Sequence, residues 1–211
     1  MNDLGSLVLL GGGGHAAVVA EAARTCGWTI VGYLDDGPAT EAARLVGLHH
    51  LGAIHDLDRF PPAALGHAAV GDGALRRRWL DALGDLVAPA IIHESAVVSP
   101  SATLAEGSFI GPRAVVNARA NVGRGVVVNS GAIVEHDCVL GAFCHIGPGA
   151  ALGGAATVGE EATIGLNASV LRHVRIGASA TLGAGGVAVR DLPEGVTAVG
   201  IPAREFAQTS G

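Results

Sequence analysis

The chain has 211 residues with 33 glycines, no lysine, 3% aromatic residues and a formal net charge of −6 at pH 7. Ordinary proteins contain about 7% glycine, so this excess indicates disorder or many ordered turns, and 49% hydrophobic with only 15% charged residues argues against disorder. The sequence lacks an apolar run of roughly 18 residues, a signal peptide and a broad basic footprint for nucleic acid, so we expect a cytoplasmic protein without a membrane span.

The first 90 residues have the pattern of an α/β unit. Trp79 is expected to pack in its core, and residues 87–92, with Pro89, form the joint to the second half. In chain order we predict a strand at 7–10, a glycine loop at 11–14, an amphipathic helix at 15–26, a strand at 30–34 ending at Asp35-Asp36, a short strand at 68–70, and a helix at 74–83.

The glycine loop between the first strand and helix is a candidate phosphate site, because bare backbone and a helix N-terminus both favour anions. Gly11-x-Gly13-x-x-Ala16 fits the dinucleotide fingerprint, and Asp35 follows at a distance typical of a ribose contact. Three strands are too few for the two-halved dinucleotide fold. We therefore favour a nucleotide-type ligand without hydride chemistry over NAD. A tight turn, with His15 an ordinary helix-end residue, is the alternative.

Residues 95–190 divide into sixteen consecutive six-residue units without an insertion. The fourth place is Val, Leu or Ile in fifteen units and fails only at Ala188, and the second place is nearly always small. These two places lie on the same side of a strand, so both are expected to face inward. The fifth place is Gly in nine units and Asn in two, Asn117 and Asn129, residue types that tolerate a left-handed corner. Stacking into triangular coils of eighteen residues is the way for such units to bury their apolar face.

This hexapeptide pattern resembles the left-handed β-helix of the hexapeptide-repeat acyltransferases. The handedness comes from that resemblance alone, because the general rule for parallel crossovers favours the right hand. We expect an α/β Rossmann-like βαβ domain at residues 1–90, followed by an all-β left-handed parallel β-helix with a C-terminal tail at residues 91–211.

Three histidines lie in the repeats. His136 occupies an outward corner and precedes Asp137, His145 also points outward, and His173 is interpreted as a surface residue. Gly154 follows His136 by eighteen residues and so lies one coil along. An imidazole base beside a bare N–H fits acyl transfer. The alternative is a solvated corner next to a turn glycine.

Five further histidines and the three cysteines are predicted to have no catalytic or metal-binding role. The cysteines are odd in number and form no CxxC, which supports neither a disulfide framework nor a cysteine zinc site. The histidines interpreted as surface residues are His49, His50, His55, His67 and His93, and the cysteines are Cys26, Cys138 and Cys144, of which the last two occupy inward second places.

Several runs carry a closer resemblance that spans both halves. They are residues 129–141, 143–145, 165–170 and 199–204 in the second half, with 11–15, 34–36 and 70–72 in the first. These runs resemble the bacterial nucleotide-aminosugar N-acetyltransferases of the PglD/NeuD group.

The resemblance implies roles for individual residues. His136 would be the general base, with its basicity raised by Asp137, and Gly154 would donate the oxyanion N–H. The implied acetyl-CoA site consists of His145 from a neighbouring subunit, Gly154, and the backbone of Leu166 and Ala184, where many members have glycine in place of Ala184. The implied substrate-binding residues are Gly13, Gly14, His15, Asp35, Asp36, Gly71 and Asn129, the last being equally a turn residue.

The function that the resemblance implies is acetyl-CoA-dependent N-acetylation of a UDP- or GDP-linked amino-deoxysugar in surface glycan biosynthesis, by a homotrimer without a metal. An O-acetyltransferase of a free sugar such as sialic acid is the nearest alternative. Others are a β-helical zinc enzyme of the carbonic anhydrase type and a non-catalytic scaffold. The repeats lack the pair of histidines five residues apart that the zinc enzymes use. The sequence leaves the base and the sugar open.

Overall fold

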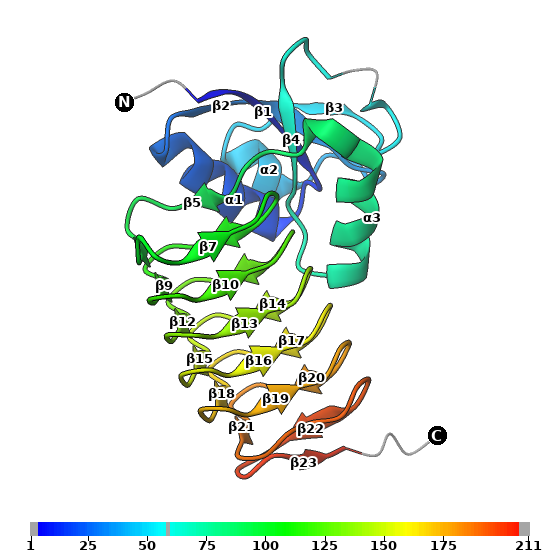
Figure 1. Ribbon diagram of the computed structural model, residues 1–211. Helices are drawn as coiled ribbons and strands as arrows, with labels where there is room; N and C mark the ends of the chain where they lie inside the picture. Colours follow the sequence, from blue (N-terminus) through cyan, green and yellow to red (C-terminus); the bar gives the residue numbers. More distant parts are fainter. Residues whose placement is uncertain (1–3, 58–59, 207–211) are drawn as a thin grey trace, which may run out of the picture.

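The computed structural model describes residues 4–57 and 60–206. An α/β unit lies at one end of a stack of triangular coils, with α3 running alongside the first coils (Figure 1). The elements of the α/β unit are β1 (Gly5–Leu10), α1 (Gly14–Thr25), β2 (Trp28–Leu34), α2 (Glu41–Leu45), β3 (His50–Gly52), β4 (Leu65–Ala68), α3 (Gly73–Leu83) and the 3₁₀ helix η2 (Gly84–Leu86).

The sheet of the α/β unit has four parallel strands in the order β3-β2-β1-β4. The predicted first two strands and the two main helices are confirmed. The strand predicted at residues 68–70 lies instead at Leu65–Ala68, and α2 and β3 were not predicted. Strand β3 is short and contains His50 and Gly52, so it carries no apolar pattern and forms by pairing with the edge of β2.

The central strand β1 is buried on both faces, as expected of a parallel sheet. Leu7 and Leu9 pack toward α1 and the β-helix, whereas Val8 and Leu10 pack toward α3. His67 pairs with Leu9 and is completely buried. The interpretation of His67 as a surface residue was therefore wrong: its side chain lies on the face of β4 that packs against the β-helix, with its ring 6.5 Å from the ring of Phe109.

From residue 91 to residue 188 the coils form three parallel sheets in which each strand pairs with the strand eighteen residues away, as Val128 does with Ile146. At the end of the stack Thr197 pairs with Thr181, and the last strand pairs antiparallel with the strand before it. The predicted β-helix and its coil length are confirmed. The eight-stranded sheet contains β5 (Ile91–Ile92), β8 (Phe109–Ile110), β11 (Val127–Val128), β14 (His145–Ile146), β17 (Thr163–Ile164), β20 (Thr181–Leu182), β22 (Thr197–Val199) and β23 (Arg204–Glu205). The six-stranded sheet contains β6 (Val97–Val98), β9 (Val115–Val116), β12 (Ile133–Val134), β15 (Ala151–Leu152), β18 (Ser169–Val170) and β21 (Val187–Ala188). The five-stranded sheet contains β7 (Thr103–Leu104), β10 (Asn121–Val122), β13 (Val139–Leu140), β16 (Thr157–Val158) and β19 (Arg175–Ile176).

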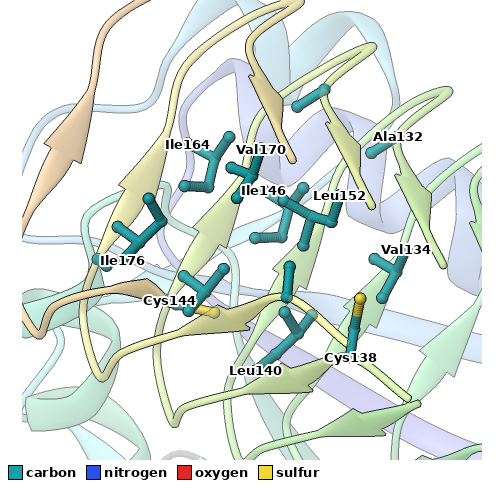
Figure 2. Close-up of a cluster of buried hydrophobic side chains, with 14 of the residues drawn as sticks. Ala132, Val134, Cys138, Leu140, Cys144, Ile146, Leu152, Ile164, Val170 and Ile176 are labelled. Carbon is teal, nitrogen blue, oxygen red and sulfur yellow. The ribbon is translucent and has the colours of Figure 1, made fainter. Parts of the chain in front are cut away.

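The interior of the β-helix is filled by the second- and fourth-place side chains, as predicted. Figure 2 shows Cys138 and Cys144 among the buried aliphatic side chains. Both cysteines are completely buried. Burial raises the pKa of the Cys144 thiol to about 12, so this group remains protonated. Neither cysteine is placed to act as a nucleophile.

The role expected for the fifth-place glycines is corrected by the structure. The left-handed residues are at the first place of the units from Gly107 onward, where non-glycine residues such as Arg119 and Asp137 have φ between 51° and 63°. Fifth-place glycines are required by close packing instead. A methyl group on Gly159 would lie 2.4 Å from the amide nitrogen of Ala178 in the next coil, so a side chain at this place would run into the backbone of the neighbouring coil.

Candidate active site

His136, Asp137 and Gly154 meet at the corner between β12 and β13. The Nδ1 atom of His136 lies 2.7 Å from Oδ2 of Asp137. A carboxylate only accepts hydrogen bonds, so Nδ1 donates and Nε2 keeps its lone pair. The two adjacent side chains therefore do reach each other, and the imidazole is oriented as a base.

The imidazole lies directly over Gly154. A methyl group on Gly154 would be 2.7 Å from both Nε2 and Cε1 of His136, so only glycine leaves room for the ring in this position. Among residues 4–57 and 60–206, the Gly154 amide has no hydrogen-bond acceptor. The predicted juxtaposition of an imidazole and an N–H without an acceptor is thus present at this corner, in the arrangement that acyl transfer requires.

Arg119 completes this corner and was not predicted from the sequence. Its Nε and Nη2 atoms donate to Oδ1 and Oδ2 of Asp137 at 2.7 Å and 2.8 Å. The Arg119 guanidinium, together with His136, holds the pKa of the Asp137 carboxyl well below its usual range. The signal that finds Arg119 is its spacing of eighteen residues from Asp137.

A pocket of about 490 Å³ opens at the glycine loop of the α/β unit. Gly13 and Gly14 are exposed with nothing within 4 Å of a methyl group built on either. Gly13 is the N-cap of α1 and no side chain caps that helix, so its first amides are open to an anion. The pocket is lined by Gly11, Gly13, Gly14, His15, Asp35, Asp36, Ala69, Val70, Gly71, Leu75, Arg78 and Trp79.

The two acidic residues of the pocket accept hydrogen bonds from backbone amides of the surrounding loops. Asp35 accepts from the amides of Gly12 and Gly37 at 2.7 Å and 2.8 Å. Asp36 accepts from the amide of Ile54 at 3.0 Å. Each carboxylate oxygen has two lone pairs, so both side chains retain capacity for a ligand hydroxyl.

His145 and Asn129 lie behind the pocket rather than at the His136 corner. Nδ1 of His145 donates to the carbonyl of Gly71 at 2.9 Å, which leaves Nε2 to accept from Nδ2 of Asn129 at 3.2 Å. The His15 ring is 6.4 Å from the His145 ring. Burial, with the nearby His145, lowers the pKa of His15 to about 4, so His15 is neutral at pH 7.

The predicted site residues lie at three places around the coil. The outer face of the eight-stranded sheet packs against the α/β unit through residues such as Phe109 and Val127. His136 lies at the corner between the other two sheets, opposite that face. Leu166 and Ala184 lie in one column, as predicted, at the corner between the eight-stranded and six-stranded sheets.

Three consecutive arginines on α3 connect the pocket to the β-helix. Arg76 is fully buried and donates to five carbonyl oxygens, those of Val70, Gly71, Gly125, Phe143 and Cys144. Arg77 pairs with Glu160 and Glu161 and lies over the Phe143 ring. Arg78 is exposed and lines the pocket, and no ion pair joins it to any described residue. No role was predicted for Arg78 from the sequence.

No group of three or more His, Cys, Asp or Glu side chains is arranged to hold a metal ion within residues 4–57 and 60–206. In the same part of the chain, none of the helices has the length and apolar character needed to cross a bilayer.

Comparison with known families and structures gives a consistent result for both halves. The PglD N-terminal domain family matches residues 6–83. PerB from Caulobacter crescentus, solved with CoA and GDP-perosamine, is similar with a TM-score of 0.89 and 40% identity, over 97% of this chain and 98% of PerB. Two further structures of that perosamine N-acetyltransferase carry a single histidine replaced by asparagine or alanine.

A second similar structure comes from another organism. The acetyltransferase domain of PglB from Neisseria gonorrhoeae FA1090, solved with acetyl coenzyme A, has a TM-score of 0.89 and 38% identity, over 95% of this chain and 98% of that domain. WeeI from Acinetobacter baumannii AYE, with a TM-score of 0.84 and 22% identity over 96% of this chain and 100% of WeeI, shares the fold. No curated protein sequence matches the chain.

Proposed function

This chain belongs to the PglD-like sugar N-acetyltransferases, and we propose that it transfers the acetyl group of acetyl-CoA to the amino group of a nucleotide-linked amino-deoxysugar, in surface glycan biosynthesis. The observation that carries the proposal is the His136 corner, where Nδ1 is held by Asp137 and the ring lies over Gly154.

The reaction is direct transfer. Nε2 of His136 takes a proton from the sugar amine as its nitrogen attacks the thioester carbonyl. The amide of Gly154 stabilises the oxyanion of the tetrahedral intermediate. The C–N bond forms, the C–S bond breaks, and the proton passes from His136 to the departing thiolate, so that CoA leaves as the thiol.

The α/β unit, residues 1–90, is proposed to bind the nucleotide part of the acceptor, and residues 91–211 to carry the acyl transfer. The open amides at Gly13 and Gly14 suit a diphosphate, and Arg78 adds a cation beside them. His15, Asp35, Asp36 and Gly71 line the same pocket. PerB was solved with GDP-perosamine, which makes a nucleoside-diphosphate amino sugar the acceptor class to test first.

We propose a homotrimer with acetyl-CoA lying between subunits. The pocket is on the side of the eight-stranded sheet, and the His136 corner is opposite it. An acceptor held by one chain therefore meets the His136 of another chain. His145, Leu166 and Ala184, away from the His136 corner, would contribute to the coenzyme site from the neighbouring subunit, and Asn129 would support His145.

Exposed apolar side chains support this assembly. Val97 and Ile133 are 62% and 39% exposed on the outer face of the six-stranded sheet. A groove of about 410 Å³ runs beside Ile133, Val115 and Pro112. A second copy packing on this face would bury these side chains, and head-to-tail contacts of this kind close into rings.

The test of the activity is thiol release from acetyl-CoA with GDP-, UDP- and dTDP-linked amino sugars, and with free sugars including sialic acid. We expect turnover with a nucleotide amino sugar. We expect His136→Ala to lower kcat by about 10²- to 10⁴-fold, the usual contribution of a general base. Near-normal kcat in His136→Ala would refute the base assignment, and turnover only with free sugars would favour O-acetylation.

The test of the shared site is complementation between two inactive variants. Gly13→Asp blocks the pocket and His136→Ala removes the base. In trimers formed from equal amounts of both, about one quarter of the sites would pair an intact pocket with an intact His136 if sites form between chains. Recovery of activity is expected, and no recovery in trimers that contain both chains would refute the shared site. Light scattering gives the number of chains.

A further inference from the structure

We propose that Arg119 is a positioning residue for acetyl transfer: its guanidinium fixes the Asp137 carboxylate in the orientation in which Oδ2 faces Nδ1 of His136. Two charge-assisted bonds from Arg119, at 2.7 Å and 2.8 Å, and one from His136, at 2.7 Å, converge on this carboxylate. The inference rests on the proposed role of His136 as the base.

The need for a positioning residue comes from the backbone at this corner. His136 and Asp137 are adjacent, and neighbouring side chains normally point in different directions. Asp137 has φ 62°, in the left-handed region that Asp tolerates better than most residues. Its carboxylate is partly exposed, with 38% of the side chain accessible, so water competes for both oxygens. A single bond to His136 leaves the rotation of the carboxylate about χ2 undetermined.

The eighteen-residue coil supplies the missing constraint. Arg119 occupies the same first place one coil earlier, with φ 58°. The amide of Asp137 donates to the carbonyl of Ala118 at 3.0 Å, which brings the two corners into register. The planar fork of Arg119 then grips both carboxylate oxygens, a geometry that a lysine ammonium does not reproduce. The carboxylate plane is fixed, and Oδ2 is directed at His136.

Arg119 and Asp137 have opposite electrostatic effects on the imidazolium form of His136. Removing the anion disfavours that form, whereas removing the cation favours it. The other ionisable side chains near this column are Glu135, which precedes His136, and Arg172 and His173, which lie two coils on. No hydrogen bond or ion pair joins any of these three to His136 among residues 4–57 and 60–206.

The experiment compares Arg119→Gln, Arg119→Lys and Asp137→Asn by steady-state kinetics across pH. We expect both Arg119 variants to lower kcat about tenfold, part of the total contribution of a general base. The acid limb of kcat/KM should move up by about half a pH unit in Arg119→Gln, the size expected for one exposed charge a few ångströms away. It should move down in Asp137→Asn and stay in place in Arg119→Lys, which keeps the charge and loses the fork.

A double variant separates positioning from general damage. If Arg119 acts through Asp137, the kcat loss of Arg119→Gln should disappear in the Asp137→Asn background. Arg44→Gln is the matched control, because within residues 4–57 and 60–206 the Arg44 side chain forms only an exposed ion pair with Glu41 on α2, and it should leave kcat and the pH profile unchanged. Thermal midpoints verify that all variants fold.

Two results would overturn the inference. One is an unchanged kcat and pH profile in Arg119→Gln. The other is an equal kcat loss with and without Asp137. Either result, with His136→Ala still inactive, leaves the proposed function intact. An active His136→Ala would instead refute the base assignment on which the inference depends.

Discussion

Replacement of Gly154 by alanine tests the most specific feature of the proposed active site. The added methyl group would lie 2.7 Å from Nε2 and Cε1 of His136. Ordinary contacts between such atoms begin near 3.4 Å, so the imidazole must retreat by about 0.7 Å or rotate away. A misplacement of about 1 Å at a reacting group costs about 10²-fold in rate. We therefore expect kcat to fall about 10²-fold, although no catalytic side chain is removed.

The same substitution should leave the fold intact. The clash is with a side chain that is 56% exposed and that can rotate toward solvent by giving up its bond to Asp137, and the φ of Gly154 lies outside the left-handed region. Alanine at such a position also restricts the unfolded chain, which stabilises a protein by about 0.4–1 kcal/mol. The thermal midpoint of Gly154→Ala should therefore be unchanged or slightly raised.

Gly141→Ala is the matched comparison. Its methyl group would also lie at 2.7 Å from another atom, but that atom is the backbone nitrogen of Glu160. Backbone in a stacked coil cannot move aside, and overpacking of this kind costs about 1–3 kcal/mol. We expect a lower thermal midpoint with kcat per folded molecule retained.

The assays are thiol release from acetyl-CoA for kcat and thermal unfolding for stability. We expect Gly154→Ala to lower kcat without loss of stability, and Gly141→Ala to lower stability without loss of kcat. A Gly154→Ala variant with normal kcat would show that the position of the His136 ring over Gly154 is not required for catalysis. A Gly154→Ala variant with a strongly lowered thermal midpoint would show that the ring cannot yield.

Two further predictions concern the α/β unit. Gly13→Asp places a carboxylate at the N-cap of α1, so the thermal midpoint should rise slightly, because Asp is a better N-cap than Gly by roughly a few tenths of a kcal/mol. KM for the nucleotide sugar should rise at least about tenfold by repulsion of phosphate, and an unchanged KM would contradict phosphate binding there. Burial lowers the pKa of His15 to about 4 and that of His67 to about 3, both from 6.5. The unfolded chain therefore binds more protons than the folded chain below pH 6.5, and stability is lost as the pH falls from there toward 4. The loss is up to about 1.4 kcal/mol per pH unit for each histidine. Thermal midpoints from pH 7 to 5 measure this loss, and His67→Leu should make it shallower; an unchanged pH dependence in that variant would refute the role of His67.

The repeat made the β-helix predictable from sequence. A six-residue period fixes which side chains face inward, and an eighteen-residue coil fixes which residues lie one above another. Gly154 was therefore placed beside His136 from spacing alone, and the same spacing joins Arg119 to Asp137. Because the six-residue units follow one another without an insertion, the register does not shift, and the spacing alone determines which residues are neighbours along the stack.

The tertiary structure decided what the repeat does not encode. The α/β unit packs on the eight-stranded sheet through Phe109 and Val127, and Arg76 bonds to the carbonyl of Phe143, 67 residues away. The local sequence pattern does not predict these contacts. That docking buries His67 and puts the pocket on the side of the coil opposite His136. The reason the fifth-place residues are glycines also appeared only in three dimensions, since it depends on the backbone of the next coil. Sequence determined the order along the stack, and contacts between distant segments determined which face of it each site occupies.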